Sequence, residues 1–277
     1  MDKSYYHISR QELGQNARIP LIKMESSEQV FRAMADIMAD CILERGAKGQ
    51  RTVFICPVGP VGQYPYFVQR VNKERISLKN VWFFNMDEYL TDEDTYIAKE
   101  SPLSFRGFMD QTVYGKIDPE LLMPESQRVF PDPANPGRVD RLIEELGGVD
   151  IAFGGIGITG HLAFNEPQPE LTCEEFAQLP TRVLEILPET RTTNSVGDLC
   201  GALEVMPRRC VTIGMRQILS ARRLCLGVFR DWHRAVVRRS AFGEKTAAFP
   251  VTLAQDHPNA VIYVNDVAAE QPYTGWL

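Results

Sequence analysis

The sequence has no apolar run long enough to span a bilayer, no long block of one charge sign and no low-complexity tract. Its opening stretch, MDKSYYHISRQELG, is polar, whereas a secretion signal has a charged start followed by an apolar core. Its six cysteines are scattered, without a CxxC pair or a histidine at metal-ligand spacing. We therefore expect a cytoplasmic protein with reduced, mostly buried thiols and no metal site.

The charge balance limits the possible partners. The formal net charge is −6 over 277 residues, which repels nucleic acid and anionic membranes overall. An anionic ligand would therefore have to meet a local cluster of arginines or backbone N–H groups. A small phosphate ester fits that description, so we expect a small-molecule partner and neither nucleic acid nor membrane.

Hydrophobic patterning predicts an α/β fold. Residues 26–49 form one apolar helical stripe, for which Ser26 and Gln29 suit a capping box and Gly46 a stop. Short buried runs typical of parallel strands alternate with further helical patterns. They occupy residues 51–57, 80–86, 149–155, 210–214, 223–229 and 259–265. No Pro/Gly/Ser-rich linker divides the chain, so residues 1–277 are expected to form one Rossmann-like domain, a mostly parallel sheet with helices on both faces.

Ligands of such sheets bind beyond the carboxyl ends of the strands, which makes the loops there the functional candidates. FNMDEY, residues 84–89, places Asp87 and Glu88 directly after one buried run. A single loop carboxylate more often caps a helix or stabilises a turn. This block alone therefore does not decide between a structural and a catalytic interpretation.

The loop GGIGITGHLAFNEP, residues 154–167, formally contains GxGxxG but does not favour a dinucleotide cofactor. Asn165, Glu166 and Pro167 interrupt the helix that such a site requires. The glycines instead let the backbone approach a ligand closely, with His161 and Glu166 nearby. A lone histidine is usually satisfied by backbone carbonyls, but here glycines, histidine and carboxylate converge at a strand end. We therefore favour a role for His161 in proton transfer.

Two later segments carry cations. PETRTTNS, residues 188–195, is read as a loop that offers Arg191 among hydroxyl and amide donors, which suits a phosphate contact. FRDWHRAVVRRSAFG, residues 229–243, places Arg230, His233 and Arg234 at the start of a helical pattern, where an anion can bind. The alternative for both segments is a solvated basic surface.

Taken in this order, FNMDEY, GIGITGHLAFNEP, TRTTNS and QDHPNAVIYVND resemble the glucosamine-6-phosphate deaminase family across nearly the whole chain. The resemblance implies that Asp87 is the base that moves a proton between C2 and C1 of the open-chain sugar. It further implies that His161 helps to open the sugar ring with support from Glu166. The implied reaction is aldose-to-ketose isomerisation of an amino sugar phosphate with loss of ammonia, without metal or redox cofactor, and the resemblance also suggests a homo-oligomer.

The chain departs from the family pattern at three places. Thr159 stands where the family usually has an aspartate. Its hydroxyl can hydrogen-bond the imidazole of His161 but cannot stabilise the imidazolium by charge, so His161 should be a weaker base unless Glu166 compensates. The family's hydroxyl-rich phosphate loop is replaced by PVGPVG, residues 57–62, where a proline removes a backbone N–H. His233, next to Arg234, stands at the position of a family lysine. The expected substrate contacts are Gly59, Gly62, Gly157, Gly160, Arg191, His233 and Arg234.

Two other functions remain open at this stage. The related 6-phosphogluconolactonases share the fold and a Gly-His turn, so a hydrolase in which His161 activates water is possible; the retained Asp87 argues against it. Thr159 and the PVGPVG loop support a third interpretation, a sugar-phosphate-binding or regulatory protein without turnover.

Overall fold

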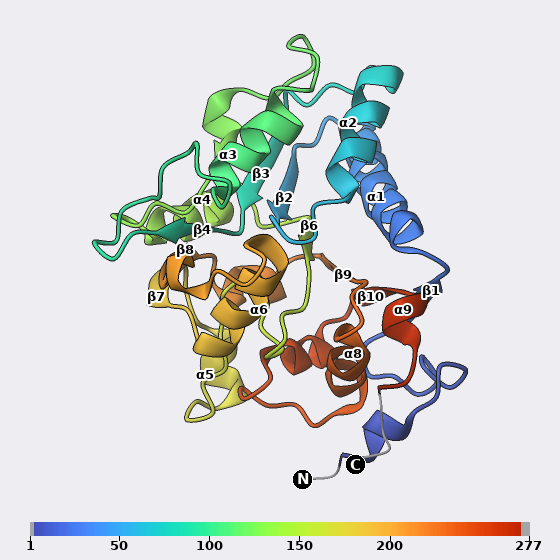
Figure 1. Ribbon diagram of the computed structural model, residues 1–277. Coiled ribbons are helices and arrows are strands. Elements are labelled where there is room, and N and C mark those ends of the chain that lie inside the picture. The colour runs from blue at the N-terminus through green and yellow to red at the C-terminus, as the bar shows by residue number, and fades with distance from the viewer. Residues whose placement is uncertain (1–2, 273–277) are drawn as a thin grey trace.

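The computed structural model describes residues 3–272 and is built around a seven-stranded sheet whose paired strands are all parallel (Figure 1). The strand order is β1-β10-β9-β6-β2-β3-β5. These strands are β1 Leu21–Met24, β2 Thr52–Cys56, β3 Val81–Asn85, β5 Arg128–Val129, β6 Ile151–Gly154, β9 Arg223–Val228 and β10 Ala260–Asn265. The expected α/β fold with a mostly parallel sheet is therefore confirmed.

Helices cover both faces of this sheet, because its central strands are apolar on both sides. Successive residues of β2 enter different cores: Val53 and Ile55 join one cluster, and Phe54 and Cys56 join the other. The first cluster is covered by α4 Gly137–Glu145, α7 Met215–Leu219, α8 His233–Phe242 and α9 Asp266–Ala269. The second is covered by α1 Ser27–Ala47 and α2 Gln63–Glu74, which lie side by side in Figure 1.

A second, three-stranded antiparallel sheet lies beside the main one, in the order β4-β8-β7. Its strands are β4 Asp87–Leu90, β7 Arg182–Glu185 and β8 Arg209–Thr212. The buried run at residues 210–214 therefore does form a strand, but in this small sheet and not in the parallel one. Its residues Cys210 and Val211 are fully buried, which gives the same sequence signature as a buried parallel strand.

The predicted long helix is confirmed as α1. Ser26 caps it by accepting a hydrogen bond from the backbone N–H of Gln29 at 3.2 Å. The reciprocal half of the capping box is shifted by one residue, because Gln29 Oε1 accepts from the backbone N–H of Glu25. The helix continues to Ala47, one residue past the predicted stop at Gly46.

Residues 188–195 are not a loop, so that prediction was wrong: they belong to helix α6, Pro188–Asp198. Threonines have low helix propensity, but Pro188 occupies the first turn, where a missing N–H costs nothing. The Thr193 hydroxyl donates back to the carbonyl of Glu189, so it does not break the helix.

The remaining helices are short. They are α3 Phe105–Met109 and α5 Cys173–Ala177, the 3₁₀ turns Ser4–His7, Glu125–Gln127, Leu203–Val205 and Pro250–Asp256, and one π-helical turn, Asp110–Tyr114. Across the described part of the chain, no helix combines the length and apolar character needed to cross a bilayer. All six cysteines are unpaired; three of them, Cys56, Cys210 and Cys225, are buried.

Candidate active site

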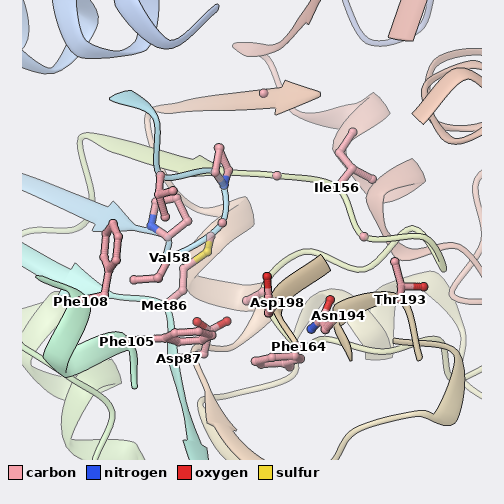
Figure 2. A pocket seen from close by; sticks show the side chains of 18 of the residues that line it. Val58, Met86, Asp87, Phe105, Phe108, Ile156, Phe164, Thr193, Asn194 and Asp198 are labelled. Atoms are coloured by element: carbon pink, nitrogen blue, oxygen red, sulfur yellow. The ribbon is translucent and has the colours of Figure 1, made fainter. Parts of the chain in front are cut away.

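A pocket of about 540 Å³ opens where four neighbouring strands of the parallel sheet end. The segments that follow β2, β3, β6 and β9 all contribute residues to its lining, and α6 closes another side. Carboxyl ends of parallel strands meet at one edge of a sheet, which is why these sequence-distant loops converge. Figure 2 shows part of the lining, including Asp87 and residues of α6.

Asp87 is held at the junction of the two sheets. Met86 pairs its backbone N–H with the carbonyl of Cys56, and Asp87 then starts β4 opposite Thr212. The Asp87 side chain lines the pocket, is 7% exposed and accepts no hydrogen bond from the described residues. Burial, and secondarily the charge of Glu88, raise the pKa of the Asp87 carboxyl well above its ordinary value. An ionised Asp87 is therefore a stronger base than a solvated aspartate.

Glu88, one residue further on, points to the other face of β4, as strand alternation requires. It is fully buried and accepts hydrogen bonds from the backbone N–H groups of Phe105 and Arg106 and from the Ser104 hydroxyl. Arg106 Nε also donates to it at 3.1 Å. Glu88 thus caps α3, a helix that contributes Phe105 and Phe108 to the pocket wall. The FNMDEY block therefore has one carboxylate that faces the pocket and one that holds the wall.

The structure brings His161, Thr159 and Glu166 together. The Thr159 hydroxyl donates to Glu166 Oε2 at 3.1 Å and lies 2.8 Å from His161 Nδ1. Because its single proton goes to Glu166, the hydroxyl accepts from Nδ1, which places the ring proton there. His161 Nε2 makes no hydrogen bond to any described residue and is left as the proton acceptor. The histidine lines the pocket with its side chain 12% exposed.

Glu166 supplies the negative charge that Thr159 lacks. Its Oε2 lies 3.2 Å from His161 Nδ1, and its side chain is 6% exposed. Burial alone would raise the pKa of Glu166, but the charge and hydrogen bond of His161, with hydrogen bonds from Thr190 and Thr159, lower the pKa below its ordinary value. Glu166 is thus an ionised partner fixed on the side of the ring away from Nε2.

The four predicted contact glycines, in the loops after β2 and β6, have different structural roles. Gly59 and Gly62 line the pocket, as does Gly157. A Cβ at Gly157 would lie 2.0 Å from His161 Nε2, so only glycine lets the ring lie against the backbone here. Gly160, with φ of +78°, turns the chain and packs against Phe249; it is not among the described residues that line the pocket.

Of the predicted cationic contacts, the structure brings neither Arg191 nor Arg234 to the pocket. Arg191 donates to the backbone carbonyls of Leu203, Met206 and Pro207, so it anchors the segment after α6. Arg234 donates to the carbonyl of Val267.

His233 does line the pocket, but as a neutral ring. Its Nδ1 accepts from the backbone N–H of Arg230 at 2.9 Å, and its Nε2 donates to the Ile156 carbonyl at 3.0 Å. Burial lowers the pKa of His233 to about 3. The ring therefore ties two loops together and carries no charge at neutral pH.

Comparison with known proteins gives the same picture. A comparison with models of protein families found no match. Among curated proteins, the glucosamine-6-phosphate deaminase of Porphyromonas gingivalis is 30% identical over 249 residues, covering 86% of this chain and 89% of that protein. This chain belongs to the glucosamine-6-phosphate deaminase family. The glucosamine-6-phosphate deaminase of Bacteroides thetaiotaomicron is likewise 30% identical, over 227 residues and 79% of this chain.

Solved structures agree on the fold of this deaminase-family chain. A monomeric glucosamine-6-phosphate deaminase superposes with a TM-score of 0.77 at 24% identity, covering 90% of this chain and 98% of that one. The 6-phosphogluconolactonase of Plasmodium vivax superposes with a TM-score of 0.64 at 13% identity, covering 90% and 91%. The curated relatives show an enzyme of the deaminase type, and the solved structures show that its fold is one that lactonases share.

Sequence reasoning did not name the α6 residues that line this deaminase-type pocket: Thr193 and, with longer polar side chains, Asn194 and Asp198. Figure 2 shows Asn194 and Asp198 reaching toward the pocket from that helix. They are four residues apart, a spacing that shares one helix face. This spacing was the available signal, but it has meaning only once the segment is recognised as a helix.

Proposed function

We propose that this enzyme converts glucosamine 6-phosphate, or a close relative, into a ketose and ammonia. The observation that carries the proposal is that Asp87 and His161 come from different strand ends and line the same pocket, each with a free acceptor atom. Such a pair can serve two separate proton transfers on one bound sugar.

His161 has the arrangement needed for ring opening. Its Nε2 takes the proton of the anomeric hydroxyl and returns it to the ring oxygen, which gives the open-chain aldehyde. During this exchange the ring is briefly an imidazolium, which Glu166 stabilises at 3.2 Å from Nδ1. Thr159 is hydrogen-bonded to both His161 and Glu166, and it holds the imidazole in the tautomer that leaves Nε2 free.

Asp87 then performs the isomerisation. The carboxylate removes the proton from C2, the C1=O double bond moves to C1–C2, and the aldehyde oxygen takes a proton from the substrate's own ammonium group. The same carboxyl then returns the C2 proton to C1. The product carries an imine at C2, and addition of water releases ammonia and leaves the ketone. The overall change is amino aldose plus water to ketose plus ammonia, with no oxidation or reduction and no cofactor.

The test is an ammonia-release assay on glucosamine 6-phosphate, on its galacto epimer and on unphosphorylated glucosamine. Wild-type enzyme should release ammonia from at least one of these sugars, and Asp87→Asn and His161→Ala should each lower that release by at least about a hundredfold. Asp92→Asn, an exposed aspartate outside the pocket lining, is the matched control and should retain activity. Release that persists in Asp87→Asn would remove Asp87 from the reaction.

A lactonase-like hydrolase is the second candidate, supported by the shared fold and by a histidine that could activate water. Hydrolysis of 6-phosphogluconolactone without ammonia release from any amino sugar would establish it. Ligand-induced stabilisation without turnover of either substrate would indicate a binding protein.

Two further expectations belong to the same proposal. We propose that the enzyme acts in the cytoplasm and self-associates; the structural neighbour is described as monomeric, so the oligomeric state is open to a direct measurement. Light scattering of the purified chain should give a mass above that of one 31.3 kDa chain.

A further inference from the structure

The charges around the pocket do not suit a phosphate group. Two of the residues that line the pocket are acidic, Asp87 and Asp198. Among the described residues that line it, only Arg230 carries a permanent positive charge, because His233 is a neutral hydrogen-bonded ring. A phosphate monoester has nearly two negative charges at neutral pH and requires matching cations or donors.

Arg230 is itself partly balanced. Its guanidinium lies against the C-terminal end of α6, where a Cβ at Gly197 would be 2.9 Å from Nη1. The C-terminal end of a helix is the negative end of its dipole, and Asp198 is the next residue. The Arg230 guanidinium therefore already faces two sources of negative potential.

The side chains of the loop after β2 offer an anion no hydrogen-bond donor. Val58 and Val61 line the pocket with hydrocarbon, and Pro60 has no backbone N–H. At the start of α2, the Phe31 ring lies against Gly62, where a Cβ would be 2.3 Å from Phe31 Cδ2. Phe31 also packs edge to face on Phe229 at 4.9 Å, so aromatic carbon covers this end of the pocket.

We propose that the substrate is an amino sugar with an uncharged C6 end, and that the pocket excludes the 6-phosphate through the negative charges of Asp87 and Asp198 and the apolar side chains of its β2–α2 loop. This inference rests on the proposed deaminase function and specifies its substrate class. Asp198 and Asp87 favour a cationic amino group, and the valine and phenylalanine side chains accommodate an uncharged end that makes few hydrogen bonds.

A binding measurement tests this without relying on turnover. The probes are two unreactive open-chain analogues, 2-amino-2-deoxyglucitol and its 6-phosphate, titrated calorimetrically into the wild-type chain. The unphosphorylated analogue should bind at least about tenfold more tightly, a ratio equivalent to about 1.4 kcal/mol. Tighter binding of the 6-phosphate would overturn the proposal, and so would the absence of binding by both analogues.

A charge variant tests the stated cause. Asp198→Asn removes one negative charge from the pocket lining and should reduce the binding preference for the unphosphorylated analogue over the 6-phosphate by about threefold to tenfold. Glu189→Gln removes the same charge from an exposed position on the same helix, outside the pocket lining, and should leave the ratio unchanged. An equal effect of both variants, or no effect of Asp198→Asn, would contradict the assigned cause.

Turnover separates this inference from the function on which it rests. Ammonia release that is faster from glucosamine than from glucosamine 6-phosphate supports both. Faster release from the 6-phosphate overturns the substrate class and leaves the deaminase intact. No release from either sugar, together with tighter binding of the unphosphorylated analogue, refutes the deaminase and supports the pocket assignment.

Discussion

Replacing Asp87 by asparagine should inactivate the enzyme and at the same time stabilise the fold. The native carboxylate is buried, receives no hydrogen bond from the described residues and has a raised pKa because of burial and of Glu88. Each unit by which folding raises a carboxyl pKa costs about 1.4 kcal/mol of stability once the group is ionised. Asparagine keeps the shape and removes the charge, so that cost disappears.

The sign of the pH dependence follows from the same shift. Below the ordinary aspartate pKa of about 3.9, Asp87 is protonated in both states and contributes no penalty. As the pH rises from about 3.9 through the raised native pKa, the unfolded chain ionises before the folded chain, and the wild-type chain loses stability relative to the variant. Above the native pKa, the difference in unfolding free energy between the two proteins should be constant.

Thermal unfolding of the two proteins measures this directly. For a chain of this size, 1 kcal/mol corresponds to about 2–4 °C in Tm, so the Tm of Asp87→Asn should exceed that of wild type by at least this amount near pH 8. The gain should shrink as the pH is lowered toward about 4. Ammonia release should fall by about 10²–10⁴-fold, the usual contribution of a general base. A lower Tm for the variant near pH 8, or unchanged turnover, would refute the reasoning.

Three further variants test the supporting residues. Thr159→Val should lower kcat by about tenfold with little change in KM, because the imidazole loses its tautomer-setting contact; a raised KM with unchanged kcat would instead indicate a substrate contact. Glu88→Gln should lower the free energy of unfolding by about 2–4 kcal/mol in denaturant, since a buried carboxylate that pairs with Arg106 is lost. A loss of less than about 0.5 kcal/mol would contradict that role. His233 has a lowered pKa of about 3, so the unfolding free energy of the wild type should fall by about 1.4 kcal/mol per pH unit as the pH drops below about 6.5. His233→Gln should remove this dependence. A variant with the same pH profile as wild type would show that His233 is not neutral in the fold.

The sequence was most informative where local patterning and tertiary structure agree. The strand at residues 51–57 and the helix from Ser26 were predicted because their apolar residues match the periods of buried strands and amphipathic helices. Asp87 and His161 were placed in the same region because both follow buried strands. Their shared pocket needed only the rule that ligands bind at the carboxyl ends of parallel strands.

The failures have a common physical cause: they depend on contacts between segments distant in sequence. Helix α6 has no apolar stripe, since it packs by Thr190 and Ser195, so its Asp198 could not be oriented from sequence. The direction of the Arg191 side chain is set by hydrogen bonds to carbonyls up to sixteen residues away. His233 looked like a cation, but its hydrogen bond to Ile156 of another loop keeps it neutral.

The central claim is that this enzyme moves a proton from C2 to C1 of an amino sugar and then releases ammonia. The most direct measurement is NMR of amino sugar incubated with enzyme, which follows the C2 hydrogen, the new C1 methylene and free ammonium together. The account predicts that a ketose with a C1 hydroxymethyl group and ammonium appear in equal amounts, and that Asp87→Asn produces neither. Amino sugars recovered unchanged at high enzyme concentration, with the C2 hydrogen unexchanged in deuterated water, would contradict it.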